Sequence, residues 1–91
     1  MTESNAADSP LQFPTDFPIK IMGLNELAFE PQVVAVVQAH APDLDLATLE
    51  VRQSRGGKYL SLTVTVRARS RAQLDAIYLA LTAHPLVKVV L

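Results

Sequence analysis

The feature that most constrains the fold is a regular alternation of apolar and polar residues from Tyr59 to Arg69. A period of two predicts a β-strand with one buried face and one open face. The predicted buried face holds Leu60, Leu62, Val64, Val66 and Ala68, and the open face holds Ser61, Thr63, Thr65 and Arg67. Residues 55–58 read Arg-Gly-Gly-Lys, and paired glycines accept the positive φ that a tight hairpin requires. A second alternating run, residues 48–53, is therefore predicted to pair with this strand.

Apolar residues at helical spacing predict two helices. The first is predicted to begin at Pro31, whose missing N–H costs nothing in a first turn, and to end at Pro42. Its periodic positions are Val33, Val36, Val37 and His40. The second is predicted to follow Ser70, because residues 70–73 (Ser-Arg-Ala-Gln) match a capping box, and to end at residues 84–85. Its periodic positions are Leu74, Ile77, Tyr78 and Leu81.

A first strand over residues 17–22 and a last strand over residues 86–91 complete the order β-α-β-β-α-β. Right-handed crossovers then predict an α+β fold, the ferredoxin-like plait: a four-stranded antiparallel sheet in the order 4-1-3-2 with two helices on one face. One such domain is expected to span residues 17–91. Residues 1–16 are polar, acidic and interrupted by Pro10 and Pro14, which predicts a flexible N-terminal tail.

A set of short motifs runs along the folded part of the chain: Phe13, Pro14, Phe17, Lys20-Ile21-Met22-Gly23, Gln32-Val33-Val34, Val36-Val37-Gln38, His40-Ala41-Pro42, Ser54, Gly57, Tyr59, Ser61, Tyr78, Val87 and Val89-Val90-Leu91. Together these residues resemble the YbeD-type family of small bacterial proteins. The resemblance implies a ferredoxin-like fold similar to that of ACT-type regulatory domains. Such domains usually dimerise and often bind amino acids near the loop after the first strand. The resemblance carries over no biochemical activity.

Composition and histidine placement argue against several classes of function. The chain has no cysteine, which removes disulfides, thiol catalysis and the common structural zinc sites. It has no apolar run near the ~18 residues of a membrane helix, and its first ten residues do not match a signal peptide. His40 and His84 are predicted to end different helices at opposite ends of the sheet, so they cannot share a catalytic site. We therefore expect a cytoplasmic, non-enzymatic protein without a metal or other cofactor.

Charge is distributed unevenly along the chain. Residues 1–50 carry a formal charge of −7, whereas residues 51–71 carry +6 and no acid. The basic residues are Arg52, Arg55, Lys58, Arg67, Arg69 and Arg71. This Arg52–Arg71 stripe makes weak nucleic-acid binding the alternative function, although Tyr59 is the one aromatic near the predicted open face. Nucleic acid is the less favoured partner, because basic charge without stacking platforms gives only salt-sensitive phosphate contacts.

The favoured function is a regulatory module that binds a small ligand or a protein. In the predicted topology, the end of the first strand, the hairpin and the start of the last strand meet at one end of the sheet. The candidate ligand-binding residues there are Gly23, Asn25, Arg55, Gly56, Gly57 and Lys58. Glycines let a ligand approach the backbone, and the two cations suit a small anionic metabolite.

A protein partner is the other possibility, including a second copy of the chain. The predicted uncovered face carries Lys20, Met22, Glu50, Arg52, Ser61, Thr63, Thr65, Arg67, Lys88 and Val90. A sheet face of this composition stays solvated or pairs with a partner. The edge strands also offer unpaired backbone groups, so a homodimer through an edge or through this face is a further expectation.

Overall fold

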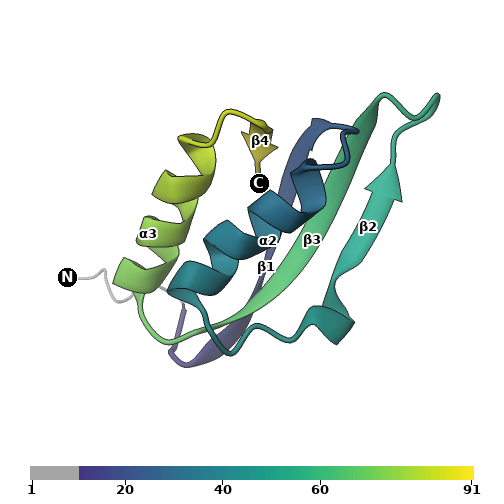
Figure 1. The fold of residues 1–91 in the computed structure, drawn as a ribbon. Coiled ribbons are helices and arrows are strands. Elements are labelled where there is room, and N and C mark those ends of the chain that lie inside the picture. Colours follow the sequence, from purple (N-terminus) through teal and green to yellow (C-terminus); the bar gives the residue numbers. More distant parts are fainter. Residues whose placement is uncertain (1–10) are drawn as a thin grey trace.

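The structure, a computed structural model, describes residues 11–91 and has the predicted α+β architecture. In chain order, its elements are β1 (Thr15–Leu24), α2 (Phe29–His40), the short 3-10 helix η1 (Leu46–Thr48), β2 (Glu50–Gln53), β3 (Tyr59–Ala68), α3 (Arg71–Thr82) and β4 (Val87–Val90). The four strands form an antiparallel sheet in the order β2-β3-β1-β4, which confirms the predicted order. Both helices lie on the same face of this sheet (Figure 1).

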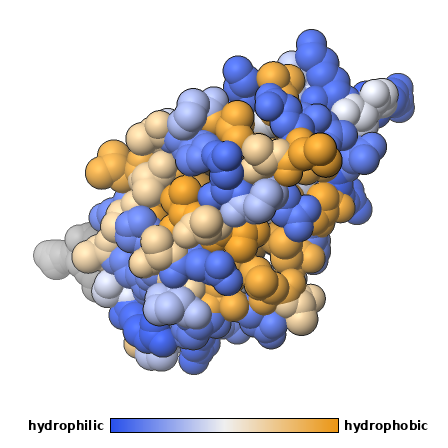
Figure 2. Space-filling model, viewed as in Figure 1, coloured by the Kyte–Doolittle hydropathy of each residue, from blue (hydrophilic) through white to orange (hydrophobic). Residues whose placement is uncertain are grey.

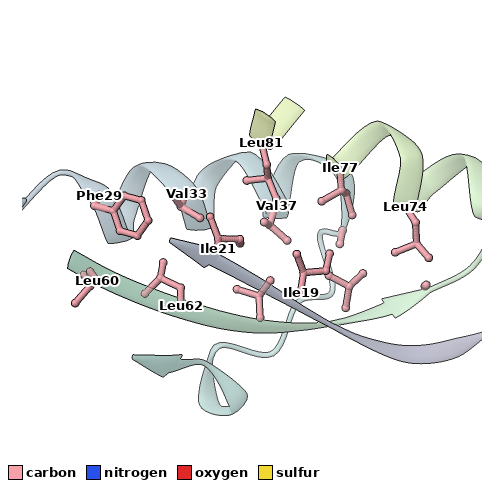
Figure 3. Close-up of a cluster of buried hydrophobic side chains, with 14 residues drawn as sticks. Ile19, Ile21, Phe29, Val33, Val37, Leu60, Leu62, Leu74, Ile77 and Leu81 are labelled. Carbon is pink, nitrogen blue, oxygen red and sulfur yellow. The ribbon is translucent and has the colours of Figure 1, made fainter. Parts of the chain in front are cut away.

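The core lies between the helices and the helix-facing side of the sheet. The apolar positions of β3 predicted to face inward are all buried, and Leu62, Val64 and Val66 have at most 1% of their surface exposed. Helix α2 contributes Phe29, Val33 and Val37, and α3 contributes Leu74, Ile77 and Leu81. Figure 3 shows the helix side chains directed at those of the strands. The predicted alternation of β3 and the apolar stripe of α3 are therefore confirmed.

Two elements begin earlier than predicted. Strand β1 begins at Thr15 rather than residue 17, because the ten-residue β3 offers partners as far as Ala68, which lies opposite Thr15. Helix α2 begins at Phe29, so Pro31 is its third residue rather than its first. Proline is tolerated there because the first N–H groups of a helix have no partner within the helix. The flexible tail was predicted for residues 1–16; residues 1–10 lie outside the described residues, and residues 15–16 belong to β1.

The start of α3 shows that the predicted capping box forms only in part. The Ser70 hydroxyl accepts a hydrogen bond from the Gln73 N–H at 3.0 Å, as predicted. The Gln73 side chain, however, accepts from the N–H of Arg69 at 2.7 Å rather than from that of Ser70. Its amide nitrogen donates to the His40 carbonyl at 2.9 Å. Gln73 thereby links the end of α2 to the start of α3.

The two edge strands differ from the prediction. Strand β2 is shorter, because Asp45 accepts from the Ala47 N–H at 3.0 Å and holds residues 46–48 in a 3-10 turn.

In β4, Val90 lies opposite the buried Ile21 and so faces the helices, which makes its predicted place on the open face wrong. Val89 takes that place, opposite Met22. The cause is a register shift between Met22 and Gly23, which a strict alternation does not include.

Candidate functional site

The end of β1 and the β2–β3 hairpin are joined, as the sequence predicted. The backbone N–H of Asn25 donates to the Lys58 carbonyl at 2.9 Å. The Asn25 side chain donates to the Gly57 carbonyl at 3.0 Å. His84 lies near the same end, since its Nδ1 accepts from the N–H of Leu86, whose carbonyl adjoins Gly23. The backbone N–H and the side-chain amide nitrogen of Asn25 therefore hold the two loops together.

The three glycines of the predicted site have structural roles. Gly56 and Gly57 have φ values of 84° and 77°, which the hairpin requires and other residues rarely adopt. Gly23 is buried, and a Cβ atom there would collide with the Leu86 carbonyl oxygen and the Phe29 ring. The space that a ligand would need next to Gly23 is already filled by the protein. This glycine permits close packing of β1, α2 and the start of β4.

The two cations of the hairpin behave differently from its glycines. The Lys58 Nζ lies 5.5 Å from the centre of the Tyr59 ring, at cation–π distance. Tyr59 lies opposite Leu24 in the ladder and is on the face of the sheet away from the helices. Arg55 is exposed and takes part in none of the ion pairs found among residues 11–91. Positive charge at this end is therefore available next to the open face.

Two hollows on the open face adjoin the hairpin. One, of about 270 Å³, has Lys20, Arg52 and Ser61 among its lining residues. The other, of about 430 Å³, is lined by Met22, Tyr59, Lys88 and Val89. Met22 and Tyr59 line both. We call the two together the open-face hollow.

The strand register explains why these residues meet. Ser61 of β3 lies opposite Met22 of β1 on one side and opposite Arg52 of β2 on the other. Met22 in turn lies opposite Val89 of β4, so one row crosses all four strands. No aspartate or glutamate side chain lines either part of the hollow. The open-face hollow therefore combines an apolar floor with a cationic border.

The basic residues at the other end of the Arg52–Arg71 stripe are paired. Arg67 contacts Asp16 at 3.2 Å, Arg69 contacts Asp43 at 2.7 Å, and Arg71 contacts Asp75 at 3.8 Å. The stripe is therefore not one surface: Arg52, Arg55 and Lys58 lie at the hairpin end, and the other three residues lie at the far end. Tyr59 is the one aromatic residue among 11–91 that the register places on the open face. The arrangement lacks the row of aromatics on which RNA-binding sheets stack bases.

Both histidines make local hydrogen bonds. His40 Nδ1 lies 3.1 Å from the Val36 carbonyl, and His84 Nδ1 accepts from the Leu86 N–H at 3.1 Å. Gln73 places His40 beside the first turn of α3, whereas His84 follows the last turn. A helix of 12 residues is about 18 Å long. The two imidazoles therefore lie at opposite ends of α3.

Within residues 11–91, no group of three or more His, Cys, Asp or Glu side chains is placed to hold a metal ion. Neither helix in this range has the length and apolar character needed to cross a membrane.

Sequence reasoning missed part of the open-face hollow. It assigned Lys20, Met22 and Arg52 to the open face correctly, but it left out Val89 and Leu91. Leu91 pairs with Lys20 through both backbone hydrogen bonds, at 3.2 and 2.8 Å, and therefore shares its face. No sequence signal marks the shifted register that brings these residues there.

The fold and the hollow define a class of protein: a small α+β domain of ferredoxin-like topology with one uncovered, partly cationic sheet face. The chain belongs to the family described as "Protein of unknown function (DUF493)", whose model matches residues 8–91. This match confirms the family resemblance inferred from the sequence motifs.

The chain is also similar to several bacterial UPF0250 proteins over nearly its whole length. It is 52% identical to one from Nitrosomonas europaea over 84 residues, which is 92% of this chain and 97% of the relative. It is 50% identical to one from a Janthinobacterium species over 91 residues, 100% of both chains. It is 54% identical to one from Ralstonia nicotianae over 84 residues, 92% of this chain and 87% of the relative.

Proposed function

We propose that this protein is a non-enzymatic regulatory module that binds a small organic anion in the open-face hollow. One observation supports this proposal above all others. Lys20, Arg52 and Lys88 border a shared apolar floor, and no side-chain carboxylate lines the hollow. An anion placed there meets three cations, none of which takes part in an ion pair within residues 11–91 of the chain.

The chemistry of the lining points to a class of ligand. Lysine and arginine donate charge-assisted hydrogen bonds to carboxylate and phosphate groups. Met22 and Val89 offer apolar contact, and the Tyr59 ring offers a flat apolar surface. Hollows of about 270 and 430 Å³ are the size of a metabolite rather than of a polymer. The ligand is therefore a carboxylate or phosphate with a short apolar or aromatic body.

This proposal moves the binding site from the loops to the sheet beneath them. Of the residues predicted from sequence, Gly23 and Asn25 are engaged in packing and loop contacts. Arg55 and Lys58 remain as nearby cations that attract the ligand. The non-enzymatic part of the proposal is supported by the local bonding of both histidines. A cytoplasmic location stays a prediction from the sequence.

Nucleic-acid binding is the competing function. The pairing of Arg67, Arg69 and Arg71 with carboxylates weighs against it, because phosphates along a strand need an unpaired basic track. A random single-stranded RNA is therefore included in the test as a second class of probe.

The test is a titration of the full chain followed by amide chemical shifts, with inorganic phosphate, hexanoate and benzoate as probes. We expect the shifts to centre on Lys20, Met22, Ser61 and Val89. Arg52→Gln is expected to weaken binding about tenfold, because it removes a charge-assisted hydrogen bond. Arg67→Gln is the matched control, since it removes the same charge from the same face at the far end.

Equal losses in the two variants would show that net charge, rather than the hollow, attracts the anion. Shifts centred on Thr65 and Arg67 would also overturn the proposal. Tighter binding of the RNA than of any small probe, with a steep salt dependence, would favour the competing function.

A further inference from the structure

Strand β2 forms an edge of the sheet that the helices leave uncovered. All four of its residues are exposed. Val51 has 45% of its surface exposed although it lies opposite Leu62, which is fully buried. Figure 1 shows β2 at the outer margin of the sheet, and Figure 2 shows hydrophobic residues at the surface between α2 and β2. An apolar side chain is thus left in solvent beside an open strand edge.

The opposite edge, β4, is protected in ways that β2 is not. A register shift interrupts its pairing with β1, and Lys88 lies at that irregularity. Bulges and lysines are common devices that keep an edge from pairing with another chain. The pairing of β2 with β3 is regular over all four of its residues, and β2 contains neither lysine nor proline. Of the two edges, β2 is therefore the one whose free backbone groups can pair with another strand.

The backbone of β2 shows which residues face outward. In the hairpin, the N–H of Ser54 donates to the Tyr59 carbonyl at 2.9 Å, so these two residues form a hydrogen-bonded pair. Such pairs alternate along an antiparallel ladder, so Arg52 and Glu50 also bond to β3. The N–H and C=O groups of Val51 and Gln53 then point away from β3, toward the free edge.

The side chains of β2 are complementary to themselves. Glu50 and Arg52 lie on the open face, opposite Thr63 and Ser61, and Val51 lies on the helix-facing side. Neither charged residue takes part in an ion pair within residues 11–91. If a second copy of β2 runs antiparallel with Val51 opposite Val51, each Glu50 lies opposite the other copy's Arg52. In this register the two Val51 residues also form a hydrogen-bonded pair, as their outward-pointing N–H and C=O groups require.

We infer that β2 is a homodimerisation edge, through which two copies form one continuous eight-stranded sheet about a two-fold axis at Val51. Each Val51 N–H donates to the other copy's Val51 carbonyl, and each Gln53 N–H donates to the other copy's Leu49 carbonyl. Two Glu50–Arg52 pairs form on the open face, as an isologous interface requires. On the other face, the Val51 side chains meet beside a groove of about 400 Å³ that Leu27, Pro31 and Leu60 help to line.

This inference goes beyond the proposed ligand site and shares one residue with it, Arg52, which lines the hollow and in the dimer meets the other copy's Glu50. A partner of another sequence would need its own complementary charges, whereas a second copy supplies both signs at the required spacing. Opposite charges placed directly across two strands attract, and like charges destabilise the pair by a similar amount. Charge reversal on β2 therefore distinguishes a second copy from any other partner.

The experiment measures the monomer–dimer equilibrium of the full chain by sedimentation velocity from micromolar to millimolar concentration. We expect the wild type to dimerise, and Glu50→Arg and Arg52→Glu each to weaken the dimer about tenfold or more. An equimolar mixture of the two variants is expected to restore dimerisation, because a doubly cationic edge then meets a doubly anionic one. Lys88→Glu, on the other edge, is the control and is expected to leave the equilibrium unchanged.

Three results would overturn the inference. They are a wild type that stays monomeric at millimolar concentration, single variants that dimerise like the wild type, and a mixture that dimerises no better than its components. Circular dichroism of each variant shows whether it is folded, and recovery in the mixture shows this independently.

Discussion

The two ends of the sheet hold their basic residues in opposite circumstances. At the end where β3 finishes, Arg67, Arg69 and Arg71 each contact a carboxylate, at distances of 3.2, 2.7 and 3.8 Å. At the hairpin end, the basic residues take part in no ion pair among residues 11–91. These residues are Lys20, Arg52, Arg55, Lys58 and Lys88. Positive charge is neutralised at one end of the molecule and available at the other.

The comparison shows that basic residues clustered in the sequence need not form one basic surface. Six basic residues lie within residues 51–71, but half of them are matched by acids that come from Asp16, Asp43 and Asp75. Exposed ion pairs stabilise a protein little, so their main effect here is to remove those arginines from a binding surface. Of the three that remain, Arg52 lines the open-face hollow, where Lys20 and Lys88 from outside this stretch join it around a floor of apolar side chains.

The largest expected effect is a loss of stability at Gly23, and it tests whether this glycine serves close packing rather than contact between its backbone and a ligand. Gly23→Ala is expected to lower the free energy of unfolding by about 2–3 kcal/mol, because a Cβ atom collides with the Leu86 carbonyl and the Phe29 ring. Gly56→Ala meets no atom within 4 Å and is expected to cost only about 1 kcal/mol, from its φ of 84°. Urea unfolding of both variants measures the difference. A smaller loss at Gly23 than at Gly56 would show that there is space beside Gly23, and Gly23 would again be a candidate for contact with a ligand.

Periodicity was sufficient to predict most of the fold. The alternation of β3 identified its buried face, because a strand with one face on a core must alternate. The stripe of Leu74, Ile77 and Leu81 identified the buried face of α3 for the same reason, with a period of 3.6. Two alternating segments around a pair of glycines then left few topologies to consider. These are local patterns that tertiary contacts reinforce.

The site was harder to predict, because it depends on register and on partners distant in sequence. A shift between Met22 and Gly23 brings Val89 rather than Val90 to the open face. The pairing of Arg69 with Asp43 joins residues 26 positions apart. The role of Gly23 depends on Leu86 and Phe29, which only the folded chain brings to it. Composition and spacing contain none of this information.

A smaller effect tests the charge difference between the ends directly. Arg69→Gln is expected to lower the free energy of unfolding by about 0.2–1 kcal/mol at low salt, because it removes the 2.7 Å contact with Asp43. Arg55→Gln removes the same charge where no carboxylate partner was found in residues 11–91, and no loss is expected. The loss in Arg69→Gln should shrink as salt is raised, because salt screens exposed pairs. Thermal unfolding at low and high ionic strength gives both comparisons, and equal losses would show that the ends do not differ.

The smallest expected effect concerns Tyr78, which supports the open-face hollow from the helix side. Its hydroxyl donates to the Leu91 carbonyl at 3.2 Å, and Leu91 lines the hollow. Burial raises the pKa of Tyr78 above its ordinary value of 10.0. The folded chain therefore keeps this proton to a higher pH than the unfolded chain does. The resulting stability is fully present below the unfolded pKa and is lost as pH rises through the folded pKa.

Tyr78→Phe removes this titration and is expected to make the free energy of unfolding fall less steeply as pH rises above the ordinary tyrosine value of 10.0. At neutral pH the variant loses one partly exposed hydrogen bond, so its stability should drop by no more than about 1 kcal/mol. Urea unfolding at a series of pH values compares the two slopes. Identical slopes would mean that the Tyr78 hydroxyl is as solvated in the folded chain as in the unfolded one. Its contact with Leu91 would then contribute nothing to holding β4 in place. Only the apolar packing of α3 against β4 would then position Leu91 at the border of the hollow.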